Sequence, residues 1–227
     1  MNIASFLTNT AARVPDKTAI RFKGTAITFR ELNAKVDAMA HGLSKVGLKP
    51  GDACILMTTD SPNWPIVYYA LAKVGAVVVP VNPIYKQREL EHSFRDSGAK
   101  AFVGHSGYLA EAIPAMDKIP EIKIRIAEGK NPPKGFTPLE DLFLKDAGEY
   151  PIYPTKPDDA WVIMYTSGTT GMPKGAVLTH FNLMKDAEVV AVVRHTEPDD
   201  VVFSVLPLFH CYGQTHSMNI SIYLGLT

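Results

Sequence analysis

The sequence is short of cysteine and shows no excess of charge of either sign, and both features exclude classes of protein. Cys54 and Cys211 are the only cysteines among 227 residues, too few for the disulfide framework of a small secreted domain. Lysine plus arginine equals aspartate plus glutamate, at 23 each, so no net field attracts nucleic acid or an acidic membrane. We therefore expect no nucleic-acid partner.

Long hydrophobic runs are also missing. No apolar stretch reaches the ~18 residues that a membrane-spanning helix needs, so we expect no transmembrane segment. Residues 1–17 lack a basic patch followed by an apolar core, which excludes a visible secretory signal. The default expectation is a cytoplasmic protein.

Short apolar runs that alternate with segments of helical spacing fill most of the chain. Runs bounded by glycine and proline predict buried strands. The strands predicted in this way are residues 53–57, 76–81, 101–103, 122–126 and 201–206. Helices are predicted at 63–73, 87–97 and 181–193, the last as a buried helix. This alternation indicates an α/β fold with mostly parallel sheets flanked by helices.

A proline-rich interruption divides the chain. Pro151, Pro154 and Pro157 fall within residues 149–159, where a run of prolines is typical of a connection between lobes. We predict a first α/β lobe at residues 1–155 and the start of a second, incomplete α/β lobe at 156–227. Ligands often bind in the crevice between two such lobes.

The segment 165–175 is the most informative stretch of the chain. It reads Tyr-Thr-Ser-Gly-Thr-Thr-Gly-Met-Pro-Lys-Gly and is flanked by apolar runs on both sides, which predicts a strand, a glycine-rich loop and a second strand. Glycines allow the backbone N–H groups to converge on one point, and successive N–H groups of this kind form an anion-binding nest. The hydroxyl groups and Lys174 add donors suited to phosphate. A polyphosphate is the ligand that this composition favours.

Two common phosphate motifs do not fit the loop. A Walker loop has glycine and lysine adjacent before serine or threonine, whereas Pro173 precedes Lys174 and Gly175 follows it. A dinucleotide fingerprint opens a helix, whereas this loop leads into a predicted strand. Taken alone, the residues leave open a plain solvated hairpin turn or a phosphate site of another kind.

Residues 165–180, from Tyr165 to His180 without a gap, resemble the signature loop of the acyl-adenylate-forming enzymes. Within that superfamily the chain looks most like the acyl-CoA synthetase and fatty-acid–CoA ligase branch. Residues 13–20, 47–52 and 75–83 resemble early blocks of the same family, in the same order. The resemblance therefore covers nearly the whole chain.

The resemblance implies ATP as the nucleotide, with Mg²⁺, and CoA as a co-substrate. It implies that the loop holds the β- and γ-phosphates, that Thr166 helps to place Mg²⁺, and that Lys174 has a catalytic role. The residues carried over as ATP-binding are Thr166, Ser167, Gly168, Thr169, Thr170, Gly171 and Lys174. Family members continue well beyond residue 227, so we expect an N-terminal piece of the enzyme, inactive by itself, whose absent portion carries the other nucleotide-binding and catalytic residues.

Residues 207–213 form a second candidate region. The segment Pro-Leu-Phe-His resembles the family's acyl-site motif, which implies a catalytic and substrate-binding role for His210 and substrate contacts from Phe209 and Gly213. Without the family, a histidine among apolar residues is more often a core residue, and Gly213 is equally explained as a helix start. Cys211 and His216 lie nearby, but no ligand pair has zinc spacing, so no metal site is predicted.

The acid itself is left open between classes. The aliphatic residues around His210 favour a medium- or long-chain fatty acid, with an aryl acid as the alternative. A different class of function is also open, in which the chain is a non-catalytic module that binds an acyl chain or phosphate, and whose exposed apolar surface leads to homo-oligomers. His180 is expected to be a local cap or packing residue.

Overall fold

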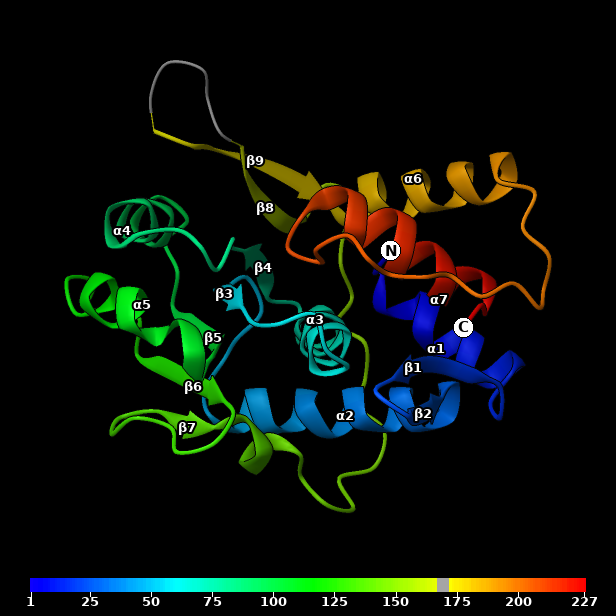
Figure 1. The fold of residues 1–227 in the computed structure, drawn as a ribbon, viewed down its shortest axis with the longest axis horizontal. Coiled ribbons are helices and arrows are strands. Elements are labelled where there is room, and N and C mark those ends of the chain that lie inside the picture. Colours follow the sequence, from blue (N-terminus) through cyan, green and yellow to red (C-terminus); the bar gives the residue numbers. More distant parts are fainter. Residues whose placement is uncertain (167–171) are drawn as a thin grey trace.

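The computed structural model describes residues 1–166 and 172–227, and its centre is one seven-stranded sheet in the order β7-β6-β5-β3-β4-β8-β9 (Figure 1). The strands are β3 (Ala53–Met57), β4 (Val77–Pro80), β5 (Ala101–His105), β6 (Ile124–Glu128), β7 (Thr137–Pro138), β8 (Ala160–Thr166) and β9 (Lys174–Thr179). In the described part of the sheet, neighbouring strands run parallel except for β8 and β9, which are antiparallel. The predicted α/β fold with a mostly parallel sheet is confirmed.

Helices cover both faces of the sheet (Figure 1). They are α1 (Ala4–Arg13), α2 (Phe29–Lys45), α3 (Asn63–Val74), α4 (Gln87–Asp96), α5 (Leu109–Met116), α6 (His180–Val193) and α7 (Ile220–Leu224), the last preceded by a π-helical turn at Gly213–Asn219. Along β3, Cys54 and Leu56 join a core with α1, α2 and α3, whereas Ile55 and Met57 join a core with α4 and α5. Successive side chains of the strand enter opposite cores, and because both faces are covered by helices, the strand is apolar at every position.

Local contacts fix the ends of two helices. Thr28 caps α2, because its hydroxyl accepts from Glu31 N–H and the Glu31 carboxylate accepts from Thr28 N–H. Gly75 ends α3 with φ +82°, and a Cβ there would lie 2.4 Å from the Tyr153 ring, so both the backbone angle and the close approach require glycine. None of the helices in the described residues combines the length and the apolar character that a membrane-spanning helix needs.

The N-terminal helix α1 was not predicted. Its buried residues include Ala4, Phe6, Leu7 and Thr10, a helical spacing that could have identified it. Next to it, β1 (Thr18–Phe22) and β2 (Thr25–Thr28) form a separate antiparallel hairpin, as the apolar runs around Gly24 indicate. Strand β7 was also missed, because two residues carry no periodic signal.

The predicted strand at residues 201–206 is wrong. This segment has no regular structure, and Val201, Phe203 and Val205 are exposed. A strand is stable only when a neighbour satisfies its backbone groups. In the described chain no strand pairs with this segment, although Val202 N–H donates to the Thr227 carbonyl at 2.8 Å. His210 therefore does not follow a buried strand.

The helix predicted at 181–193 exists as α6, but the expectation that it is buried holds on one face only. Leu183, Met184 and Ala187 pack into the core, whereas Val192 is 76% and Val193 68% exposed. Hydrophobicity around the whole helix led to the prediction of burial. Nothing in the described residues covers the outer face.

The proline-rich segment 149–159 connects the two predicted lobes, and the sheet continues across it. Strand β8 pairs with β4 through Val162 and Val78, so residues on both sides of position 155 belong to one sheet. The division into lobes at 155/156 stays a prediction. Tyr153 N–H donates to the Lys73 carbonyl at 2.9 Å, which fixes this connection to the end of α3.

A buried ion pair joins α2, α3 and this connection. Lys73 Nζ lies 2.5 Å from Asp37 Oδ1, and the two side chains are 1% and 6% exposed. Asp37 also accepts hydrogen bonds from Asn33 Nδ2 (3.0 Å) and Tyr150 N–H (3.0 Å). These extra donors are what a buried carboxylate needs to offset the loss of its hydration.

Removal of the ammonium group alone should be strongly destabilising. We expect Lys73→Met to lower the free energy of unfolding by about 3–5 kcal/mol, because it leaves a buried charge without its partner. Urea titration followed by circular dichroism measures the change. The matched control is Asp16→Ala, which breaks the exposed pair with Arg30 and should cost less than about 1 kcal/mol. Equal small losses in both variants would contradict this account.

Candidate functional site

The open end of the β8–β9 hairpin holds the first candidate residues. Thr166, the last residue of β8, pairs directly with Lys174, the first residue of β9, and both side chains are exposed. Directly opposed residues of an antiparallel pair project from the same face of the sheet, with Cβ atoms roughly 5 Å apart. The two side chains therefore leave the hairpin from neighbouring points and are open to solvent, so a hydroxyl group and an ammonium group are both available to an anion there.

The two strands predicted on either side of the glycine-rich segment are confirmed as β8 and β9. The remaining predicted phosphate-binding residues lie outside the described residues. They are Ser167, Gly168, Thr169, Thr170 and Gly171. The described part of the candidate site is therefore the hairpin end itself, with Thr166 and Lys174.

Two side chains of α4 contact the hairpin end. The Tyr165 hydroxyl donates to Asp96 Oδ2 at 2.7 Å, and His92 Nε2 lies 2.7 Å from the Pro173 carbonyl oxygen. The rings of His92 and Tyr165 meet edge to face, with centroids 6.1 Å apart. Burial, and then the neighbouring Asp96 carboxylate, raise the pKa of Tyr165, so its hydroxyl stays a proton donor.

The base of the hairpin is fixed by Trp161 and His180. Trp161 is fully buried, its indole N–H donates to the Tyr68 hydroxyl at 2.9 Å, and its ring stacks on His180 at 4.9 Å. His180 Nδ1 accepts a hydrogen bond from Ile3 N–H at 3.2 Å. Thr179 caps α6. His180 is thus a packing residue, as predicted.

The second candidate region, residues 207–213, forms the turn that opens the last helical segment. His210 is exposed, its N–H donates to the Pro207 carbonyl at 3.1 Å, and its Nδ1 accepts from Tyr212 N–H at 3.2 Å. With Nδ1 occupied in this way, Nε2 is the ring nitrogen left to face solvent or a ligand. Phe209 is half-buried beside it.

Gly213 is buried where the chain passes close to its own backbone. A Cβ at this position would lie 2.3 Å from the Pro207 carbonyl oxygen, so the turn requires glycine for packing. The next residue, Gln214, is 1% exposed, and its Nε2 lies 3.7 Å from Met164 Sδ on β8. This contact connects the turn that carries His210 to the strand that ends in Thr166.

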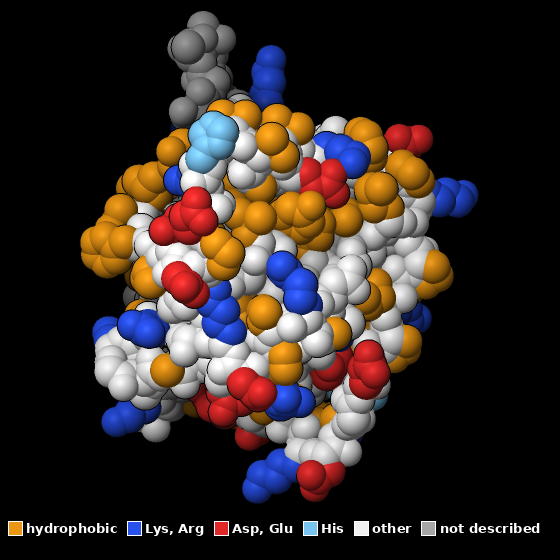
Figure 2. Space-filling view, turned by 90° about the vertical axis from the view of Figure 1, so that its right-hand side faces the viewer, with side chains coloured by type: hydrophobic (Ala, Val, Ile, Leu, Met, Phe, Trp, Pro, Cys, Tyr) orange, Lys and Arg blue, Asp and Glu red, His pale blue; other side chains and the backbone are white. Residues whose placement is uncertain are grey.

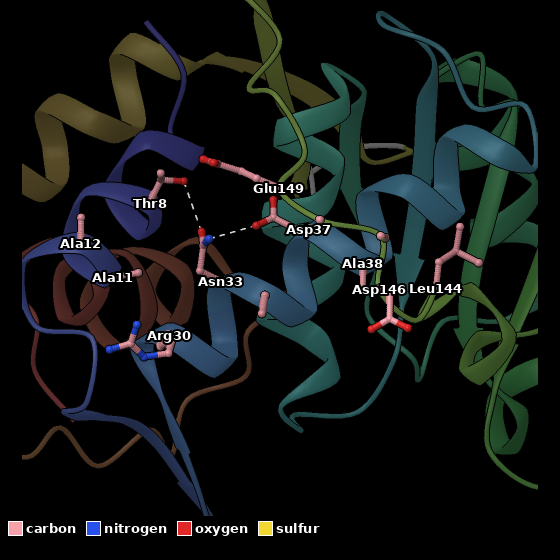
Figure 3. Close-up of a pocket in the computed structure, with 13 residues that line it drawn as sticks. Thr8, Ala11, Ala12, Arg30, Asn33, Asp37, Ala38, Leu144, Asp146 and Glu149 are labelled. Carbon is pink, nitrogen blue, oxygen red and sulfur yellow. Dashed lines mark hydrogen bonds between the residues drawn. The ribbon is translucent and has the colours of Figure 1, made fainter.

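One cavity borders the second candidate region, and another lies apart from both candidate regions. One of about 490 Å³ is lined by Phe203, Leu208, Met218 and other side chains, and Leu208 belongs to the Pro-Leu-Phe-His segment. Its backbone N–H donates to Asp60 Oδ1 at 3.0 Å. The other cavity, of about 510 Å³, lies between α1, α2 and residues 144–149 (Figure 3). None of the described residues that line it was predicted as a site residue.

Figure 3 also shows why the larger cavity has a polar wall. Thr8 donates to Asn33, and Asn33 donates to Asp37, at 3.2 and 3.0 Å. Asp37 is already paired with Lys73, so this wall belongs to the buried ion-pair network. Among the described residues there is no group of three or more His, Cys, Asp or Glu side chains placed to hold a metal ion.

Comparison with known proteins decides the family. The family described as "AMP-binding enzyme" matches residues 7–227. The chain belongs to this family. The acyl-adenylate-forming resemblance of the sequence is thereby confirmed.

Relatives of the chain include ligases for different acids. A long-chain-fatty-acid–CoA ligase of Bacillus subtilis is 33% identical over an alignment that covers 98% of this chain and 45% of the relative. A feruloyl-CoA synthase of an Amycolatopsis species is 34% identical over 208 residues, with 92% and 39% covered. The chain spans less than half the length of these two curated relatives.

Solved structures agree with the fold. A long-chain-fatty-acid–CoA ligase from Archaeoglobus fulgidus superposes with a TM-score of 0.89 at 29% identity, over 100% of this chain and 46% of that one. The α/β arrangement with a mostly parallel sheet is therefore that of known acid–CoA ligases.

Three residues around the hairpin were not recognised from the sequence as contributors to the candidate site. His92 and Asp96 lie on a helix whose charged residues read as an ordinary solvated face. Gln214 lies between Gly213 and Thr215, in a short polar segment that has no periodic pattern. Only His92 and Asp96 carried a usable signal, a spacing of four on one helix face, and nothing in the sequence says what that face meets.

Burial of His180 should make stability depend on pH. Burial, and then the N-terminal charge, lower the pKa of His180 from 6.5 to about 4, so the unfolded chain binds this proton more tightly than the folded one. The stabilisation is complete above pH 6.5 and is lost as the pH falls toward 4, by up to about 3 kcal/mol. Urea unfolding of wild type and His180→Phe across this range measures it. A pH-independent difference between the two proteins would contradict the assignment.

Proposed function

We propose that this chain is part of an ATP-dependent acid–CoA ligase and that it holds the β- and γ-phosphates of ATP. The observation that carries the proposal is the exposed Thr166–Lys174 pair at the open end of the β8–β9 hairpin. A hydroxyl donor beside an ammonium group fits an anionic phosphate. Membership of the AMP-binding family makes ATP the expected phosphate compound.

The reaction proposed for the whole protein has two steps. A carboxylate attacks the α-phosphorus of ATP and releases pyrophosphate, giving an acyl-adenylate, and the CoA thiol then displaces AMP to give the thioester. Lys174 stabilises negative charge on the departing pyrophosphate, and the Thr166 hydroxyl donates a hydrogen bond to a phosphate oxygen. Thr166 also offers one oxygen toward Mg²⁺, but the described residues contain no acidic cluster for the ion, so no step is assigned to it.

His210 is proposed as a catalytic and substrate-contacting residue for the carboxylic acid. Its Nε2 is free to meet a carboxylate because Nδ1 is held by Tyr212 N–H. Phe209 and Gly213 are proposed to contact the acid from the same turn. The contact between Gln214 and Met164 supports a single site that includes both this turn and the hairpin.

A fatty acid of medium or long chain is the proposed substrate, and an aryl acid is the alternative. The fatty-acid–CoA ligase from Bacillus subtilis favours the first, and the feruloyl-CoA synthase from Amycolatopsis favours the second at similar identity. The cavity beside Leu208, with Phe203, Met218 and Ile222 in its lining, supports an apolar substrate. The cytoplasmic location stays a prediction from the sequence.

A non-catalytic binding module is the second candidate, because apolar surface is exposed. Figure 2 shows hydrophobic side chains gathered over the upper half of the face that carries the end of α6 and the segment after it. Val192, Val193, Val201 and Phe203 are each more than 60% exposed. Such a surface favours self-association or capture of an acyl chain. Under this alternative the 227-residue chain binds ligands but catalyses nothing.

Removal of the Lys174 charge tests the phosphate role. We expect Lys174→Ala to weaken MgATP binding by about ten- to a hundredfold, because a charge-assisted hydrogen bond contributes about 1.5–3 kcal/mol. Isothermal titration calorimetry on the 227-residue chain gives both affinities. Lys134→Ala, at an exposed lysine of a distant loop, is the matched control and should bind like wild type. Equal affinities in all three proteins would exclude Lys174 from the site.

Light scattering tests the binding-module alternative. If the exposed apolar surface drives association, the scattering mass of the wild-type chain should rise with protein concentration and change when a long-chain fatty acid is added. A monomer at all concentrations that ignores the fatty acid would contradict the alternative. Acid-dependent exchange of pyrophosphate into ATP by the same chain would contradict it as well, because that exchange requires adenylate formation.

A further inference from the structure

We propose that helix α4 is a positioning element for the phosphate end of the hairpin, and that His92 and Asp96 are the positioning residues. The inference rests on the proposed function, since it assigns α4 a part in ATP binding. Neither side chain has to touch the nucleotide. Each acts through the hairpin residue that it holds.

The two contacts act on both strands of the hairpin. Asp96 accepts from the Tyr165 hydroxyl at 2.7 Å, and Tyr165 directly precedes Thr166 on β8. His92 Nε2 lies 2.7 Å from the Pro173 carbonyl oxygen, and Pro173 directly precedes Lys174 on β9. Each contact is thus one residue away from a proposed phosphate-binding side chain.

The spacing on the helix matches the spacing of the strands. His92 and Asp96 are four residues apart, so they lie on the same face of α4, about one turn apart. The strands they reach lie about 4.8 Å apart in the hydrogen-bonding direction. One helix face can therefore hold Tyr165 and Pro173 at the same time.

Gly175 makes room for the Tyr165 ring. It is the direct partner of Tyr165 across the hairpin, and a Cβ there would lie 3.2 Å from Tyr165 Cζ and 2.9 Å from Ile163 Cγ2. Without that Cβ, the phenol ring lies across the neighbouring strand. The hairpin is thus shaped to accept the contact with α4.

The helix itself is firmly anchored. Leu90 and Phe94 on its opposite face are fully buried in the core beneath α4 and α5. Lys118 Nζ lies 2.7 Å from Glu91 Oε2, which ties the helix to the segment after α5. A fixed helix that holds two strands lowers the conformational entropy that the hairpin end loses when it binds a ligand.

The test compares disruptive and conservative changes at each position. Asp96→Ala removes the acceptor, and Asp96→Asn keeps a carbonyl oxygen that the Tyr165 hydroxyl can still reach. His92→Leu removes the donor, and His92→Gln keeps an N–H group. Arg88→Ala, at an exposed position of the same helix, controls for changes in helix propensity or surface charge.

Two readouts separate the contact from its function. Hydrogen–deuterium exchange of the β8 and β9 amides reports whether α4 holds the hairpin. Calorimetric titration with MgATP reports whether that hold matters for binding. We expect Asp96→Ala and His92→Leu to exchange about tenfold faster and to bind MgATP about tenfold more weakly. Asp96→Asn, His92→Gln and Arg88→Ala should stay within about twofold of wild type in both.

Other outcomes would contradict the contact, the positioning role or the proposed function separately. Unchanged exchange in Asp96→Ala and His92→Leu would overturn the contact. Faster exchange with unchanged MgATP affinity would overturn the positioning role, as would conservative variants that behave like the disruptive ones. A wild-type chain that binds no MgATP would overturn the proposed function, and the exchange readout would then still show whether α4 holds the hairpin.

Discussion

Burial of Trp161 is the interaction on which the arrangement of the candidate site depends. Its indole lies between Tyr68 of α3 and His180 of α6, and His180 in turn accepts a hydrogen bond from the backbone of Ile3. A large aromatic side chain of this kind buries much apolar area, and its N–H hydrogen bond fixes the orientation of the ring. One residue of β8 thus fixes the hairpin relative to α1, α3 and α6, although β8 pairs with β4 through the single register pair Val78–Val162.

From this anchor the hairpin extends outward, and its support changes from apolar packing to polar contacts. Near the base, β8 is held by Trp161 and Val162, which are fully buried. At the open end, the supports are the hydrogen bonds of Tyr165 and Pro173 with α4. A site for a charged ligand has to be open to water, so an apolar core cannot extend to Thr166 and Lys174. Polar contacts from a neighbouring helix are a way to hold such a segment in position.

The sequence predicts the core of this fold well and its edges poorly, for physical reasons. Strands such as Ala53–Met57 are apolar throughout because helices cover both faces, and this signal is local. The segment at 201–206 has the same local signal, yet whether it becomes a strand depends on a partner elsewhere in the chain. The apolar residues on the outer face of α6 likewise favour burial, but the sequence does not show which segment, if any, covers them.

The residues of the candidate site likewise fall into those with a local sequence signal and those without one. The glycine-rich segment and Lys174 stand out because the order of residues from Tyr165 to His180 resembles a family signature, and His180 was assigned correctly as a packing residue. The roles of His92 and Asp96 could not be predicted, because they depend on the placement of α4 beside a strand about seventy residues later in the chain. Long-range contacts of this kind leave no periodic pattern in the sequence.

The most direct test of the central claim is an NMR titration of the ¹⁵N-labelled chain with inorganic tripolyphosphate, which carries the phosphate chemistry without nucleoside or acid. If the open end of the hairpin binds phosphate, saturable shift changes should be concentrated at the amides of Thr166 and Lys174 and at their neighbours on β8 and β9. Shift changes spread evenly over the exposed lysines, or absent from the hairpin, would contradict a phosphate site at this end of the sheet.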